Sequence, residues 1–160
     1  MAINLGLSVI VSRCVGAGDY EQAKYYKKKV RLIMHISFII SSAIVLALMP
    51  LILKVYDLSS EANNMIWIIV IAHAVMMILI WPSGYMPPIV FRGAGDAKFP
   101  MVISIASMLL LRIAFSYEFS LGFHMGMMGT WFAMFLDWIV KSIIYEWHYK
   151  NDKWTRFKTI

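Results

Sequence analysis

Long uncharged stretches of apolar residues alternate with short charged segments along the whole chain. A helix needs about 20 apolar residues to cross the hydrocarbon core of a bilayer. Residues 1–12 are apolar but too short to span, and resemble the second half of a crossing. The pattern predicts an all-α integral membrane protein with four full transmembrane helices plus a partial N-terminal one. The full crossings are expected at Leu32–Leu53, Ala62–Phe91, Phe99–Tyr117 and Met125–Trp147.

The stretch Ala62–Phe91 is longer than one crossing requires. Its 30 residues would measure about 45 Å as a straight helix, against a core of about 30 Å. Pro82, Gly84, Pro87 and Pro88 lie in its second half. Because proline removes a backbone donor and clashes with the preceding turn, we expect a bent or broken helix there.

The tetrapeptide Gly-Ala-Gly-Asp occurs twice, and its two copies are 77 positions apart. Glycine reaches positive φ at low cost, and an aspartate can accept from the first N–H groups of the next helix. Each copy is therefore expected to form a tight turn between helices, and Pro100 fits the start of the second helix. Either the two turns share an ancestor or the short motif recurred independently. The turn residues are Gly16, Gly18 and Asp19 in the first copy and Gly93, Gly95 and Asp96 in the second.

The basic residues collect on one side of the predicted bundle. Two crossings separate the glycine turns, so both turns fall on the same face. By the positive-inside rule this face is cytoplasmic, and the C-terminus with it. Residues 20–31 are expected to form a short helix at the anionic leaflet surface, opened by an Asp19–Gln22 capping box. The face carries Lys24, Lys27, Lys28, Lys29, Arg31, Arg92, Lys98, Lys150, Lys153, Arg156 and Lys158, whereas the other has Lys54 alone, in a loop with Asp57 and Glu61.

Composition supports the membrane assignment and excludes several function classes. The chain is 61% hydrophobic and 15% charged, far from the balance of a soluble domain. Its net charge of +6 is confined to short loops, which argues against a nucleic-acid partner. A single cysteine, Cys14, excludes an internal disulfide, and no metal, phosphate-loop, dinucleotide or hydrolase motif occurs. We therefore expect neither an enzyme nor a bound cofactor or metal.

Ionisable residues inside a crossing are costly, so each is a candidate for function. His73 lies midway along its stretch and could relay a proton, or could be satisfied by a neighbouring helix. Arg112 and Asp137 fall at similar depth on consecutive antiparallel helices. A structural ion pair between them is favoured over a substrate or proton site. Lys141 lies four residues after Asp137 and competes for it, so the partner stays open.

Thirteen methionines are many for a chain of 160 residues. Met76 and Met77 lie on the helix that is expected to bend. Flexible, polarizable side chains suit a pocket that accepts varied aromatic cations, although lipid contact or packing in the bundle is the favoured explanation for any single methionine.

Three segments together resemble the MATE family of multidrug and toxic compound extrusion transporters: Ala2–Lys29, Phe91–Pro100 and Gly126–Trp154, the last with Gly129, Trp131 and Asp137–Trp138. The resemblance implies a twelve-helix antiporter of two six-helix lobes in the cell membrane. Such a protein exports small organic cations in exchange for protons or sodium. Residues 1–160 would supply the end of helix eight through helix twelve, and the N-terminal lobe would be missing.

The chain departs from the family pattern at two places. Ser12–Arg13 replaces a usual Gly-Gln pair, and Ala62–Phe91 lacks the acidic residue that holds sodium in some members. Coupling would then rest on the missing lobe. Two alternatives remain: a lipid-linked oligosaccharide flippase of the same superfamily, and a small standalone membrane protein acting in assembly or regulation.

Overall fold

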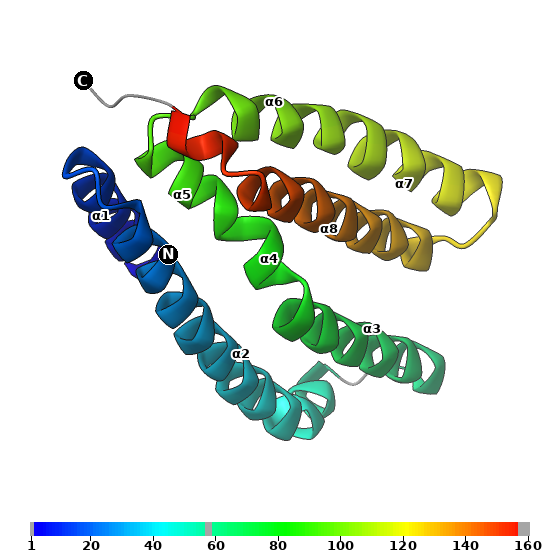
Figure 1. Cartoon of the computed structure of the whole chain (residues 1–160). Coiled ribbons are helices and arrows are strands. Elements are labelled where there is room, and N and C mark those ends of the chain that lie inside the picture. The colour runs from blue at the N-terminus through cyan, green and yellow to red at the C-terminus, as the bar shows by residue number, and fades with distance from the viewer. Residues whose placement is uncertain (1, 57–58, 157–160) are drawn as a thin grey trace.

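The computed structural model describes residues 2–56 and 59–156, and every regular element in these two ranges is helical (Figure 1). The chain forms α1 (Ala2–Gly16), α2 (Tyr20–Tyr56), α3 (Ser60–Leu79), α4 (Trp81–Tyr85), α5 (Pro87–Gly93), α6 (Lys98–Ser107), the π-helical turn η1 (Met108–Ala114), α7 (Phe115–Tyr117), a second π-helical turn η2 (Glu118–Gly122), α8 (Met127–Lys150) and the 3₁₀ turn η3 (Lys153–Arg156).

Four helical segments in the described residues are long and apolar enough to cross a membrane. They confirm the four expected crossings, and α1 is a shorter apolar helix, as predicted. Leu51, Val55 and Leu110 are among many large apolar side chains that are more than half exposed. An apolar outer surface of this extent fits lipid rather than water. The protein is therefore an all-α, multi-pass membrane protein. The crossings are Tyr20–Tyr56, Ser60–Leu79, Lys98–Gly122 and Met127–Lys150.

The first crossing is one continuous helix of 37 residues. The prediction of a separate surface helix over residues 20–31 is therefore wrong. Between Tyr20 and Leu32 the chain has no glycine or proline, and its lysines are good helix formers, so nothing ends the helix before the apolar run begins. At 1.5 Å per residue α2 is about 55 Å long, so part of it extends beyond the bilayer core.

The second crossing breaks twice, which confirms the expected interruption. The breaks fall at Ile80, between α3 and α4, and at Met86, between α4 and α5. Because Pro87 and Pro88 have no N–H, the carbonyls of Ser83 and Gly84 lose the donors that a continuous helix would supply. The short helix α4 is thus set off from both neighbours in the middle of the protein.

Helix α8 packs against α4 and against the crossing that begins with α6 (Figure 1). Gly129 permits the second of these approaches, whereas a Cβ on Gly84 would make an ordinary van der Waals contact. A Cβ on Gly84 would lie 3.6 Å from the carbonyl oxygen of Trp138, and one on Gly129 would lie 2.6 Å from the backbone of Phe119. The latter distance is too short for any side chain, so Gly129 is required where α8 meets η2.

Both glycine turns and the end of α8 lie at the same end of the bundle, as the orientation argument requires (Figure 1). A buried cluster at this end joins α1, α5 and α8 through Leu7, Val11, Phe91, Tyr145 and Trp154. At the opposite end, Lys54 and Glu61 lie in the last turn of α2 and the first turn of α3. Asp57 and Lys158, which also entered that argument, lie outside the described residues.

Candidate functional site

Asp137 lies near the middle of α8, on a transmembrane segment, and its side chain is fully buried. Its Oδ2 atom is 2.9 Å from Nζ of Lys141, one helical turn further along. Its Oδ1 atom is buried without a hydrogen-bond partner in the described residues. The carboxylate is therefore paired with a cation through one oxygen. Its other oxygen can accept a further hydrogen bond.

Arg112 is not the partner of Asp137. It lies in η1 and is exposed, whereas the Lys141 side chain is only 11% exposed and bonded to the carboxylate. The ion pair that the sequence favoured is therefore not formed, and the competing lysine takes its place. The i,i+4 spacing within one helix needs no particular helix packing, which is why Lys141 succeeds. Arg112 instead presents a charge on the outer surface of this crossing.

His73 contacts α8 through aromatic rings. Its imidazole lies 5.4 Å from the rings of both Trp131 and Trp138, measured between centroids. Its Nδ1 atom is buried and has no hydrogen-bond partner in the described part of the chain. His73 therefore lies close to the helix that bears Asp137, with one ring nitrogen unbonded in the described residues.

Met76 and Met77 line two different cavities. Met76 faces a cavity of about 440 Å³ between α3, the end of the third crossing and α8, together with Phe119, Met125, Phe132, Phe135, Leu136 and Ile139. Met77 and His73 face a smaller cavity of about 190 Å³ between α2 and α3. Neighbouring residues on a helix point about 100° apart, so the structure separates two methionines that the sequence grouped together.

The two glycine turns have the same backbone geometry. Gly18 and Gly95 adopt positive φ values of 74° and 92°. Asp19 and Asp96 each accept through Oδ1 from the N–H three residues later, at 2.9 and 3.4 Å, which confirms their expected capping role. Three backbone hydrogen bonds are the same in both turns, 77 positions apart. In the first turn the N–H groups of Ala17, Gly18 and Asp19 donate to the carbonyls of Arg13, Val15 and Cys14, in that order. In the second turn those of Ala94, Gly95 and Asp96 donate to Val90, Arg92 and Phe91.

Gly16 and Gly93 contribute differently. A Cβ on Gly16 would meet nothing within 4 Å, whereas one on Gly93 would lie 3.1 Å from Val11 in α1. Gly93 is thus needed for packing rather than for the turn. The expected capping box at Asp19 is half formed, because the Gln22 side chain accepts from Sγ of Cys14 instead of from the backbone of Asp19.

The second turn is closed by the end of α8. Asp96 is 2% exposed, and its Oδ2 atom lies 2.9 Å from Nε2 of His148. The His148 ring stacks on Phe99 with a centroid distance of 3.7 Å. Asp19, in the first turn, is exposed. The turn between α5 and α6 is therefore fixed to the last helix, and the turn between α1 and α2 is not.

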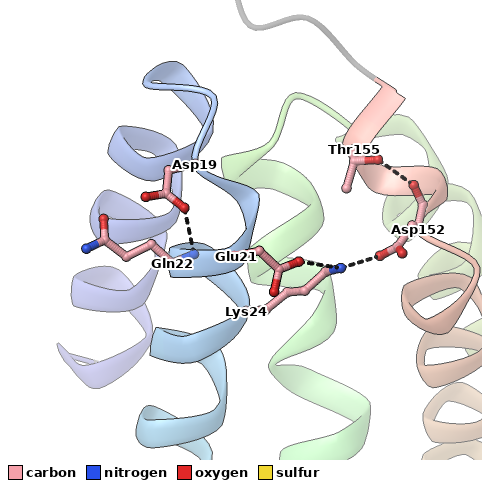
Figure 2. A network of polar contacts seen from close by, with 6 residues as sticks. All are labelled: Asp19, Glu21, Gln22, Lys24, Asp152 and Thr155. Carbon is pink, nitrogen blue, oxygen red and sulfur yellow. Dashed lines mark hydrogen bonds and ion pairs between the residues drawn. The ribbon is translucent and has the colours of Figure 1, made fainter.

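Acidic residues at the end of α8 bind the basic start of α2. Glu146 pairs through Oε1 with Arg31 at 3.0 Å and with Lys27 at 3.5 Å. Lys27 also lies 3.3 Å above the ring of Tyr149. Figure 2 shows the outermost contact, in which Nζ of Lys24 lies between the carboxylates of Glu21, at 3.3 Å, and Asp152, at 3.2 Å.

The sequence analysis did not identify Glu146 or His148 as partners of these groups. A signal was present, because Glu146 is the second acidic residue of the last crossing and falls at the level of the predicted lysine-rich face. The sequence could not predict that α2 approaches α8, because 70 residues lie between the two helices.

The helices and the buried charges between them define a multi-pass membrane protein of the transporter class. The family model MatE matches residues 1–118 of the chain, and the chain belongs to this family of transporters. The matched residues include both glycine turns and the broken crossing, and end before α8. No solved structure matches the chain.

Proposed function

We propose that residues 1–160 form the C-terminal part of a secondary active multidrug antiporter, from the end of helix eight through helix twelve. The complete protein would consist of two six-helix lobes in the cell membrane, with the C-terminus in the cytoplasm. It would export small organic cations in exchange for protons or sodium. The observation that carries the proposal is the apolar cavity beside Met76, within a chain of the MatE family.

The lining of this cavity fits an aromatic cation. Phenylalanine rings present negative π-faces, and methionine adapts to ligands of different shape. No basic residue is among its lining residues in the described structure. The diphosphate of a lipid-linked oligosaccharide would need cations around it, and the described lining of this cavity has none. The apolar lining therefore favours drug export over that alternative.

Asp137 and His73 are the proposed sites for the coupling ion. The free Oδ1 atom of Asp137 can take up a proton or face a sodium ion, and Lys141 compensates its charge when no ion is bound. This would place coupling groups in the C-terminal lobe although Ala62–Phe91 contains no acidic residue. The breaks at Ile80 and Met86 offer hinges beside Asp137 for alternating access.

Export can be tested by expressing the full-length gene in a pump-deficient cell and following the efflux of ethidium. Efflux that depends on an ion gradient supports the proposal, and unchanged dye retention contradicts it. His73→Ala should impair efflux if His73 relays protons, and wild-type efflux at every pH would remove it from the pathway.

The two methionines provide a matched test of the cavity. Met76→Ala enlarges the proposed binding cavity and should raise the KM for ethidium severalfold, because the ligand loses apolar contact. Met77→Ala removes the same side chain from the adjacent position, which faces the other cavity, and should leave KM near the wild-type value. Equal effects of the two changes would contradict the assignment of the cavity.

A further inference from the structure

The five cations at the start of α2 divide into two groups. Lys24, Lys27 and Arg31 pair with carboxylates, two of them with Glu146 and one with Glu21 and Asp152. Lys28 and Lys29 are exposed and form no ion pair within the described residues. The helix therefore uses one face to hold α8 and presents two uncompensated charges on another.

These two lysines line a groove of about 660 Å³ on α2, together with Tyr25, Arg31, Leu32 and His35. Nζ of Lys29 lies 5.5 Å from the ring centre of Tyr25, which limits where this ammonium can move. The charge of Arg31 is already directed to Glu146, at 3.0 Å. The groove thus offers two free ammonium groups to a ligand of negative charge.

An apolar track continues from the groove along the same face of the helix. Leu32, Ile36 and Ile39 follow Lys28 by four, eight and eleven positions, a spacing that keeps them on one side of an α-helix. Their exposed fractions are 59%, 50% and 51%. A ligand that fills both parts needs a negatively charged head and an apolar tail.

We propose that this groove binds an anionic phospholipid, with the headgroup phosphate between Lys28 and Lys29 and an acyl chain along Leu32, Ile36 and Ile39. The site lies where α2 passes from its charged first turns into the uncharged run, which is the level of the headgroups. A free phosphate would occupy only the charged half and would leave the apolar track uncovered. The proposal is independent of drug export, because it rests on α2 alone.

The test uses the purified full chain in micelles that contain equal amounts of phosphatidylglycerol and phosphatidylcholine. Native mass spectrometry counts the lipids that remain bound. The wild-type chain should retain phosphatidylglycerol preferentially, and Lys28→Gln/Lys29→Gln should reduce that preference by about fivefold per lysine, the factor that corresponds to about 1 kcal/mol per charge near the surface. The control Lys98→Gln/Lys150→Gln removes the same charge from exposed positions at the same end of the bundle and should retain the preference.

Two further measurements distinguish the source of the phosphate. Inorganic phosphate should not displace the bound lipid, and Ile36→Ser should weaken lipid retention without a change of charge. Displacement by inorganic phosphate would show a free-anion site and overturn the proposal. So would a wild-type chain without preference, or equal losses in the double variant and its control.

Discussion

At the scale of single residues, the pair of Asp137 and Lys141 is the most demanding feature of the protein. A fully buried carboxylate is costly unless a cation compensates it, and Lys141 does so within the same helix. Since one carboxylate oxygen stays without a donor, the pair is incompletely satisfied in this state.

Removing the lysine alone should be harmful. Lys141→Met leaves Asp137 buried without its cation and should lower the free energy of unfolding by about 3 kcal/mol, the usual cost of breaking a buried pair. The double variant Asp137→Asn/Lys141→Met removes both charges and should recover most of the loss. Thermal unfolding of the purified protein in detergent measures both. A double variant less stable than Lys141→Met would contradict the claim that Lys141 compensates the buried charge of Asp137.

Residue-level chemistry could be predicted from the sequence where it is local. The caps formed by Asp19 and Asp96, and the positive φ of Gly18 and Gly95, follow from a few consecutive residues. The partner of Asp96 could not be predicted in this way. His148 is 52 positions away, and only the packing of α8 against the second turn brings the two together.

At the scale of elements, α2 is joined to α8 by ion pairs between long side chains. Glu146 of α8 receives Lys27 and Arg31, and Arg31 also donates to the hydroxyl of Ser83 in α4. Arg31 therefore connects α2 with both α8, through Glu146, and α4, through Ser83.

Glu146→Gln should test this connection. The change leaves the buried Lys27 and the partly buried Arg31 without their acid, so we expect a loss of 2 kcal/mol or more, about the cost of an uncompensated buried charge. Glu21→Gln is the matched control. Its carboxylate is 86% exposed and pairs only with Lys24, and such surface pairs contribute at most about 1 kcal/mol. Similar shifts of the unfolding midpoint in the two variants would contradict the claim that the ion pairs of Glu146 stabilise the fold.

The elements themselves followed from the sequence more readily than their ends and joints. Four crossings and an interruption around Pro82–Pro88 were predicted, because apolar length and proline act locally. The uninterrupted run of α2 was not, since charge alone marks where a helix leaves the bilayer and not where it ends. The third crossing also continues past Tyr117 through π-helical turns to Gly122, which no composition pattern signals.

At the scale of the whole molecule, one end of the bundle is basic and the other is nearly free of cations. Both glycine turns and the end of α8 share the basic end (Figure 1). The outer surface between the ends is apolar. By the positive-inside rule this arrangement predicts that the basic end is cytoplasmic, and the proposed direction of export depends on that prediction.

The measurement that tests this orientation most directly is cysteine accessibility of the full-length protein in intact cells. In a background with Cys14 and every other native cysteine of the full-length protein replaced by serine, Lys54→Cys, Lys98→Cys and Lys150→Cys each place one thiol at an exposed position. A membrane-impermeant maleimide should label position 54 from outside, and should reach positions 98 and 150 only after permeabilisation. Labelling of 98 or 150 on intact cells, with 54 protected, would contradict the account.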